Sequence, residues 1–195
     1  MARAANKTVE RGRIRMKTKR SSGSFWSKTY VSWLVYGLLA LLVVILQMAP
    51  RLFPAVGFAR PVPLVPFVVC VALFEGVRIG AGIGLIAGLL WDVYAFRLFG
   101  FDALLLMAFG LAVGLLVQWL LRANFLSAML LCGGTVLLQA LLEWLFCYVL
   151  FQKEELWTVL VKVYLPNAAY TLVLAPLIYL LALAVARFLR RRANG

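Results

Sequence analysis

Histidine is absent from this 195-residue chain, and its acidic residues number only seven. Without an imidazole, the chain lacks the commonest general base and metal ligand, which argues against zinc hydrolases and Ser-His chemistry. Cysteine is scarce as well, since only three are present and all lie within apolar runs. We expect Cys70, Cys132 and Cys147 to be small buried hydrophobic residues rather than a disulfide framework, and we expect no metal and no cofactor.

Apolar residues are what the chain has in excess: 65% of it is hydrophobic, and its mean hydropathy is +0.97. A soluble domain of this size has too little interior for so much apolar surface, so the solvent is a bilayer. The apolar runs are too long for barrel strands, which predicts an all-α polytopic membrane protein. Six transmembrane helices are predicted, at about residues 30–49, 63–75, 79–96, 101–121, 125–151 and 168–188.

Two of the predicted spans contain helix-breaking residues. The second is short, and Pro66 near its start with Gly76 beyond its end predicts a thin or kinked helix. Pro176 predicts a kink in the last span. Residues 156–164, which precede that span, are amphipathic and carry Lys162, so we expect a short helix at the membrane interface there.

Basic residues are concentrated at the ends of the chain, and nine of the twenty lie in residues 1–28. This segment is predicted to be a disordered cytoplasmic tail, followed by a membrane domain at 29–190 and a cytoplasmic end at 191–195. With both termini inside, fifteen of the twenty basic residues face the cytoplasm, which agrees with the positive-inside rule. The sequence has no basic surface interleaved with aromatic residues of the kind that binds nucleic acid. We therefore expect four residues to contact anionic lipids: Arg187, Arg190, Arg191 and Arg192.

A glycine pattern marks the third span. Gly80, Gly84 and Gly88 recur every four residues, and Asp92 follows at the same spacing. On a helix the last three of these positions lie within about 80° of one another, so they form one small-residue face. Such a face lets another helix backbone approach closely, and Gly110 with Gly114 repeats the pattern in the fourth span. We favour a packing seam, with a partner or ligand surface as the open alternative.

The turn between the third and fourth spans gathers charged residues at the outer end of both helices: Asp92, Arg97 and Asp102, with Gly100 among them. Two neighbouring aspartates suggest the hypothesis of an aspartic protease, in which two carboxylates share a proton. These two instead flank a turn and belong to no G-x-G-D motif, so catalysis is disfavoured. An ion pair or helix-terminal hydrogen bonding that fixes the turn is the preferred interpretation.

Glu143 is the acid that lies deepest in the predicted membrane region, with Gln139 one helical turn before it. An intramembrane carboxylate is a functional candidate, because leaving it in lipid is costly. Proton coupling, substrate binding and a hydrogen bond to a neighbouring helix all stay open, and the helix–helix bond is the one we favour. A transporter would be expected to show internal repeats with broken helices, and no clear repeat is visible.

Residues 80–94, G-A-G-I-G-L-I-A-G-L-L-W-D-V-Y, and residues 98–106, L-F-G-F-D-A-L-L-L, resemble the MreD family of bacterial rod-shape-determining proteins. That family shows a glycine-bearing span ending in an aspartate, a short turn with Leu-Gly, and then an Ala-Leu run. The matching positions here are Gly84, Gly88, Asp92, Leu98, Gly100, Ala103 and Leu104. Length, six spans and a basic C-terminus extend the resemblance over about residues 30–190.

The resemblance implies a non-enzymatic scaffold of the elongation machinery in the bacterial inner membrane, supporting cell shape and peptidoglycan synthesis. Its implied partner is the bitopic protein MreC and, through it, the MreB filament, a RodA-like glycosyltransferase and a class B penicillin-binding protein. The family also resembles in fold the substrate-binding subunits of energy-coupling-factor (ECF) vitamin transporters. A vitamin-binding transporter subunit is therefore the alternative function, and Asp92, Asp102 and Glu143 are the residues that could line its pocket.

Overall fold

The computed structural model describes residues 30–49, 61–95, 100–119, 124–146 and 160–194. Within these ranges the regular structure is entirely helical, which confirms the predicted all-α class. The chain divides into two compact units, Met1–Val35 and Tyr36–Gly195. Of the first unit, only the beginning of the helix Tyr30–Met48 is described, so all contacts reported below belong to the second unit.

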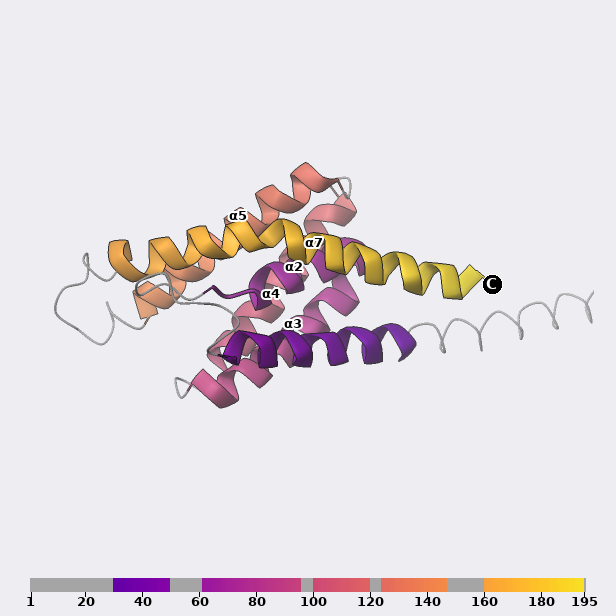
Figure 1. Ribbon diagram of the computed structural model, residues 1–195, viewed down its shortest axis with the longest axis horizontal. Coiled ribbons are helices and arrows are strands. Elements are labelled where there is room, and N and C mark those ends of the chain that lie inside the picture. The colour runs from indigo at the N-terminus through magenta and orange to yellow at the C-terminus, as the bar shows by residue number, and fades with distance from the viewer. Residues whose placement is uncertain (1–29, 50–60, 96–99, 120–123, 147–159, 195) are drawn as a thin grey trace, which may run out of the picture. The chain divides into compact units, whose positions relative to one another are not determined.

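The remaining helices follow in chain order in Figure 1: α2 Leu64–Glu75, α3 Val77–Ala95, α4 Phe101–Trp119, α5 Phe125–Trp144, the π-helical η2 Leu160–Tyr164 and α7 Leu165–Asn194. Among the described residues, five helices are long and apolar enough to cross a membrane. They cover Tyr30–Met48, Val77–Tyr94, Phe101–Trp119, Phe125–Trp144 and Val161–Arg191. The chain is therefore a polytopic membrane protein.

One further apolar helix, α2, is shorter than these five, and protein rather than lipid surrounds it. Its 12 residues span about 18 Å, against about 30 Å for the hydrocarbon core. Every residue from Leu64 to Leu73 is buried, and α2 contacts α3, α4, α5 and α7. A helix that is apolar on all sides is typical of such a central position.

Side chains of two other helices pair backbone amides at the start of α2, one just before the helix and one at its first residue. The Val62 N–H donates to Thr171 Oγ1 of α7 at 3.0 Å, and the Leu64 N–H donates to Gln47 Oε1 at 3.2 Å. Unpaired backbone groups at membrane depth would cost several kcal/mol each, so irregular backbone persists there only where protein supplies partners. These two bonds therefore hold the start of α2.

In the C-terminal half, the described residues cover two of the sequence predictions only in part. The α-helical part of α5 ends at Trp144, and residues 147–159 lie outside the described structure, so the predicted end at residue 151 is untested. The described part of the predicted interfacial piece is the short helix η2, which runs without a break into α7, and its location at the membrane interface stays a prediction. Pro166, the second residue of α7, has no N–H to donate to the preceding turn, and the backbone directly before α7 is π-helical rather than α-helical.

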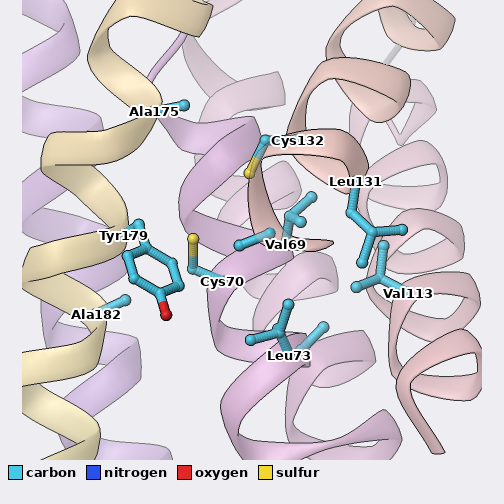
Figure 2. Close-up of a cluster of buried hydrophobic side chains, with 11 residues drawn as sticks. Val69, Cys70, Leu73, Val113, Leu131, Cys132, Ala175, Tyr179 and Ala182 are labelled. Carbon is cyan, nitrogen blue, oxygen red and sulfur yellow. The ribbon is translucent and has the colours of Figure 1, made fainter. Parts of the chain in front are cut away.

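Small and aromatic side chains join α2 to α4, α5 and α7 in a buried cluster (Figure 2). It contains Val69, Cys70, Ala72, Leu73, Val113, Ala128, Leu131, Cys132, Ala175, Tyr179 and Ala182. The Tyr179 ring packs against Phe74 and Phe125, with centroid distances of 5.4 and 5.3 Å. Cys70 and Cys132 are buried free thiols, as predicted, whereas Cys147 lies outside the described residues.

Candidate functional site

Helices α3 and α4 pack backbone against backbone along the glycine positions. A Cβ atom added at Gly84 would collide with the carbonyl oxygen of Leu106, and one added at Gly88 would collide with the backbone of Ala103. The other three predicted glycines continue the contact, since Gly80 and Gly110 face each other and Gly114 faces Val77. The contacting pairs run in opposite directions along the two helices, so α3 and α4 are antiparallel. We call these contacts the glycine seam.

The glycine seam is filled by this chain itself. Gly80 also faces the Ala72 side chain of α2, where an added Cβ would lie 2.5 Å from the Ala72 Cβ. A methyl group at such positions would force the helices apart, and overpacking of this kind costs about 1–3 kcal/mol. The geometry therefore favours the packing interpretation, and it leaves this face no room for a partner helix.

Asp92, near the end of α3, binds the first backbone amides of α4. Its side chain is 4% exposed. Oδ2 accepts hydrogen bonds from Gly100 N at 2.9 Å and Ala103 N at 3.1 Å, and Oδ1 accepts one from Asp102 N at 3.2 Å. A helix N-terminus presents unpaired N–H groups and partial positive charge, so a carboxylate is well matched to it. Gly100 adopts φ +94°, a left-handed conformation that favours glycine.

Both oxygens of Asp92 are thus occupied by backbone donors. Asp102 is 1% exposed and lies in the first turn of α4, where a negative charge is favourable. Helix-terminal hydrogen bonding, one of the two preferred interpretations of this turn, is what these residues display. The predicted ion pair is untested, because Arg97 lies outside the described residues. The arrangement is that of a structural cap rather than two carboxylates sharing a proton.

The polar pair of α5 is joined within its own helix. Gln139 Nε2 donates to Glu143 Oε1 at 2.9 Å, and Gln139 is 5% exposed. Thr135, one turn earlier, donates its hydroxyl back to the Leu131 carbonyl at 2.7 Å, as buried threonines in helices do. Gln139 and Glu143 thus form an i, i+4 bond within α5, and a bond from Glu143 to a neighbouring helix stays a prediction.

Gln139 and Glu143 line a small cavity of about 40 Å³ between α5, the start of α7 and the start of α2. Sequence reasoning missed its other polar residues, Tyr164, Asn167 and Thr171. Asn167 and Thr171 stand one helical turn apart in an apolar stretch, and that spacing is the signal that could have found them.

The expected vitamin pocket does not form from the three predicted acids in the described structure. Asp92 and Asp102 lie at the α3–α4 junction, and only Glu143 lines the cavity. Pockets for drug-sized ligands measure about 300–1,000 Å³, so this cavity is several times too small for a vitamin.

The opposite end of α2 is held by residues that the sequence did not indicate for this role. Tyr36 donates its hydroxyl to Glu75 Oε1 at 3.1 Å. Arg190 donates from a guanidinium nitrogen to the Phe74 carbonyl at 3.0 Å, which places a cation at the C-terminus of α2. Of the four arginines predicted to contact lipid, Arg190 thus also contacts protein. Arg187 and Arg191 are exposed, and the side chain of Arg192 is not described.

Residues 27–190 match the family model described as rod shape-determining protein MreD. No curated protein and no solved structure matched the chain. Because the family match spans most of the chain and the described helices include five that could cross a membrane, the chain belongs to the MreD family of rod shape-determining proteins and is a multi-pass protein of the inner membrane.

Proposed function

We propose that the protein is a non-enzymatic scaffold that supports peptidoglycan synthesis during elongation by binding a bitopic MreC-like protein. Through that partner it connects to an MreB filament, a RodA-like glycosyltransferase and a class B penicillin-binding protein. The family match supports a role in the rod-shape complex. The observation that carries the scaffold mechanism is the α3–α4 pair, locked by the glycine seam and by the Asp92 cap. A scaffold needs such fixed geometry, because a pre-organised surface loses less entropy on binding.

The proposed topology has six membrane crossings with both termini in the cytoplasm, in an arrangement like the substrate-binding subunits of ECF transporters. In this proposal α2 completes its crossing with residues 61–63. Thr171 pairs the Val62 amide in this segment, and Gln47 pairs the amide of Leu64, the first residue of α2. The excess of basic residues at both chain ends supports the orientation. The tail at 1–28 and the arginines of α7 would then contact anionic lipids of the cytoplasmic leaflet.

Partner contact is proposed at the outer end of the α3–α4 pair, outside the glycine seam. Val93 and Tyr94 are 58% and 53% exposed in the described structure and directly follow the buried Asp92. Their backbone is held by the same helix that the seam and the cap fix. A rigid element with exposed apolar and aromatic side chains is typical of a surface that buries against another protein.

Purification from native membranes tests this function. The tagged full chain is extracted in mild detergent, and the proteins and small molecules that accompany it are identified by mass spectrometry. We expect a bitopic periplasmic protein in near-equal amount, reduced when both Val93 and Tyr94 are replaced by serine. The matched control replaces Leu126 and Leu130, exposed residues of α5, by serine. A bound vitamin without a protein partner would overturn the scaffold and favour the transporter subunit.

A further inference from the structure

The cavity beside Gln139 has no part in the proposed scaffold, and its chemistry indicates a ligand of its own. Its walls come from the start of α2, the last turns of α5 and the junction of η2 with α7. The ten lining residues are Val62, Val65, Val136, Gln139, Ala140, Glu143, Tyr164, Asn167, Ala168 and Thr171. They include one carboxylate and no lysine or arginine, so a positive ligand is favoured over a negative one.

One polar atom on this wall lacks a partner among the described residues: the side-chain oxygen of Gln139. The amide nitrogen of the same side chain donates to Glu143. A carboxylate oxygen accepts but does not donate, so the flipped amide, with its oxygen facing Glu143, could not form this bond. Thr171 is already satisfied, since its hydroxyl accepts from Val62 N and donates to the Asn167 carbonyl. What the cavity lacks is therefore a hydrogen-bond donor facing Gln139 Oε1.

A buried carbonyl oxygen that is left unpaired destabilises the folded chain, so a donor that enters the cavity and pairs it would be bound favourably. A water molecule needs roughly 10–15 Å³ of such volume, so 40 Å³ admits a group of only two or three heavy atoms. A primary ammonium group meets each requirement, because it is small, positive and carries three donors. A trimethylammonium group has no N–H donor and is larger.

We propose that this cavity binds a primary ammonium group, with Gln139 Oε1 accepting a hydrogen bond from it and the Glu143 carboxylate supplying the negative charge. The group has two possible sources of the same chemistry: a soluble amine, or the headgroup of an ethanolamine lipid. The site is separate from the glycine seam and the Asp92 cap, so this proposal stands or falls independently of the scaffold function.

The test uses the full chain in phosphatidylcholine nanodiscs. Thermal unfolding is followed while ammonium, ethanolamine, sodium or choline chloride is added at constant ionic strength. We expect saturable stabilisation by ammonium and ethanolamine, and none by choline or sodium beyond a common salt effect. Replacing part of the phosphatidylcholine with phosphatidylethanolamine assigns the source. A lipid that stabilises the chain and removes the response to soluble ethanolamine is the occupant, whereas an unchanged response points to the soluble amine.

Two substitutions place the response at this cavity. Gln139→Met keeps the side-chain length but removes the acceptor, and Glu143→Gln removes the charge. Each is expected to raise the half-saturating concentration about tenfold or more. The matched control is Gln118→Met, on an exposed position of α4, and should leave the response unchanged. Equal responses of the unaltered chain to ammonium, sodium and choline, or no response at all, would overturn the proposal, and these comparisons need no variant to fold. Undiminished selectivity in Gln139→Met would also overturn it.

Discussion

The carboxylate of Asp92 accepts a 2.9 Å hydrogen bond from the backbone N–H of Gly100, and so ties the end of α3 to the start of α4. The same carboxylate takes two further amides from the first turn of α4. The glycine seam continues the attachment along both helices. Cap and seam together make the α3–α4 pair one rigid unit, which distinguishes it from helices that merely lie side by side in lipid.

Replacing Asp92 by alanine should destabilise the protein, because three backbone amides at the start of α4 would lose their acceptor. A loss of about 1–3 kcal/mol is expected. Asp92→Asn keeps one acceptor oxygen without the charge and should fall between the wild type and Asp92→Ala. The measurement is the unfolding midpoint in detergent. Equal midpoints for Asp92→Ala and the wild type would show that the cap contributes nothing.

Alanine should have opposite effects at two glycines. At Gly84 the added methyl would meet the backbone of Leu106, so the unfolding midpoint should fall, by an amount equivalent to about 1–3 kcal/mol. At Gly134 of α5 the added atom meets nothing within 4 Å, so Gly134→Ala should be neutral or raise stability by up to about 1 kcal/mol. A pair of changes with the same sign would argue against close contact at the seam.

Thr171→Val is expected to lower stability, since it removes the acceptor for the Val62 N–H and leaves that amide unpaired at the start of α2. The expected loss is about 1–3 kcal/mol, because valine fills nearly the same volume and the hydrogen bonds account for the difference. Thr171→Ser retains the hydroxyl and serves as the control. Hydrogen exchange of the Val62 amide provides a local readout, and protection that survives Thr171→Val would show that another group pairs it.

Cys70 of α2 and Cys132 of α5 belong to the same buried cluster, and Figure 2 shows their sulfur atoms directed toward one another. A short bis-thiol reagent such as dibromobimane should therefore join them within one chain. The experiment is done in a Cys147→Ser background, with Cys70→Ser as the control that abolishes cross-linking. Mass spectrometry identifies the joined peptides, and two singly modified peptides in place of the joined pair would contradict the packing of α2 on α5.

Periodicity and hydropathy predicted most of the fold because lipid imposes a simple rule: long apolar runs must be helical. The four-residue glycine spacing likewise pointed to close helix contact. The glycine spacing did not indicate which helix would face the glycines. Gly84 and Leu106 are 22 positions apart in the chain and meet at the Leu106 backbone. Such a contact does not depend on a matching pair of side chains, so it cannot be recognised in the sequence.

Several site features were invisible for a different physical reason. Thr171 and Gln47 accept hydrogen bonds from the backbone amides of Val62 and Leu64 at the start of α2. Every residue except proline supplies such an amide, so the sequence did not indicate these partners. The last span was predicted to begin at about residue 168 because a proline usually suggests a helix boundary, whereas the helix continues through Pro166 from η2 into α7.

The scaffold mechanism is tested most directly by counting partner molecules per chain in complexes captured from native membranes, for the wild type, Gly84→Leu and Gly134→Leu. Captured chain is first passed through size exclusion, so that only folded protein is counted. We predict a near-equal amount of a bitopic protein with the wild type and Gly134→Leu, and its loss with Gly84→Leu. Full partner occupancy on folded Gly84→Leu would contradict the claim that the α3–α4 seam holds the partner-binding surface in place.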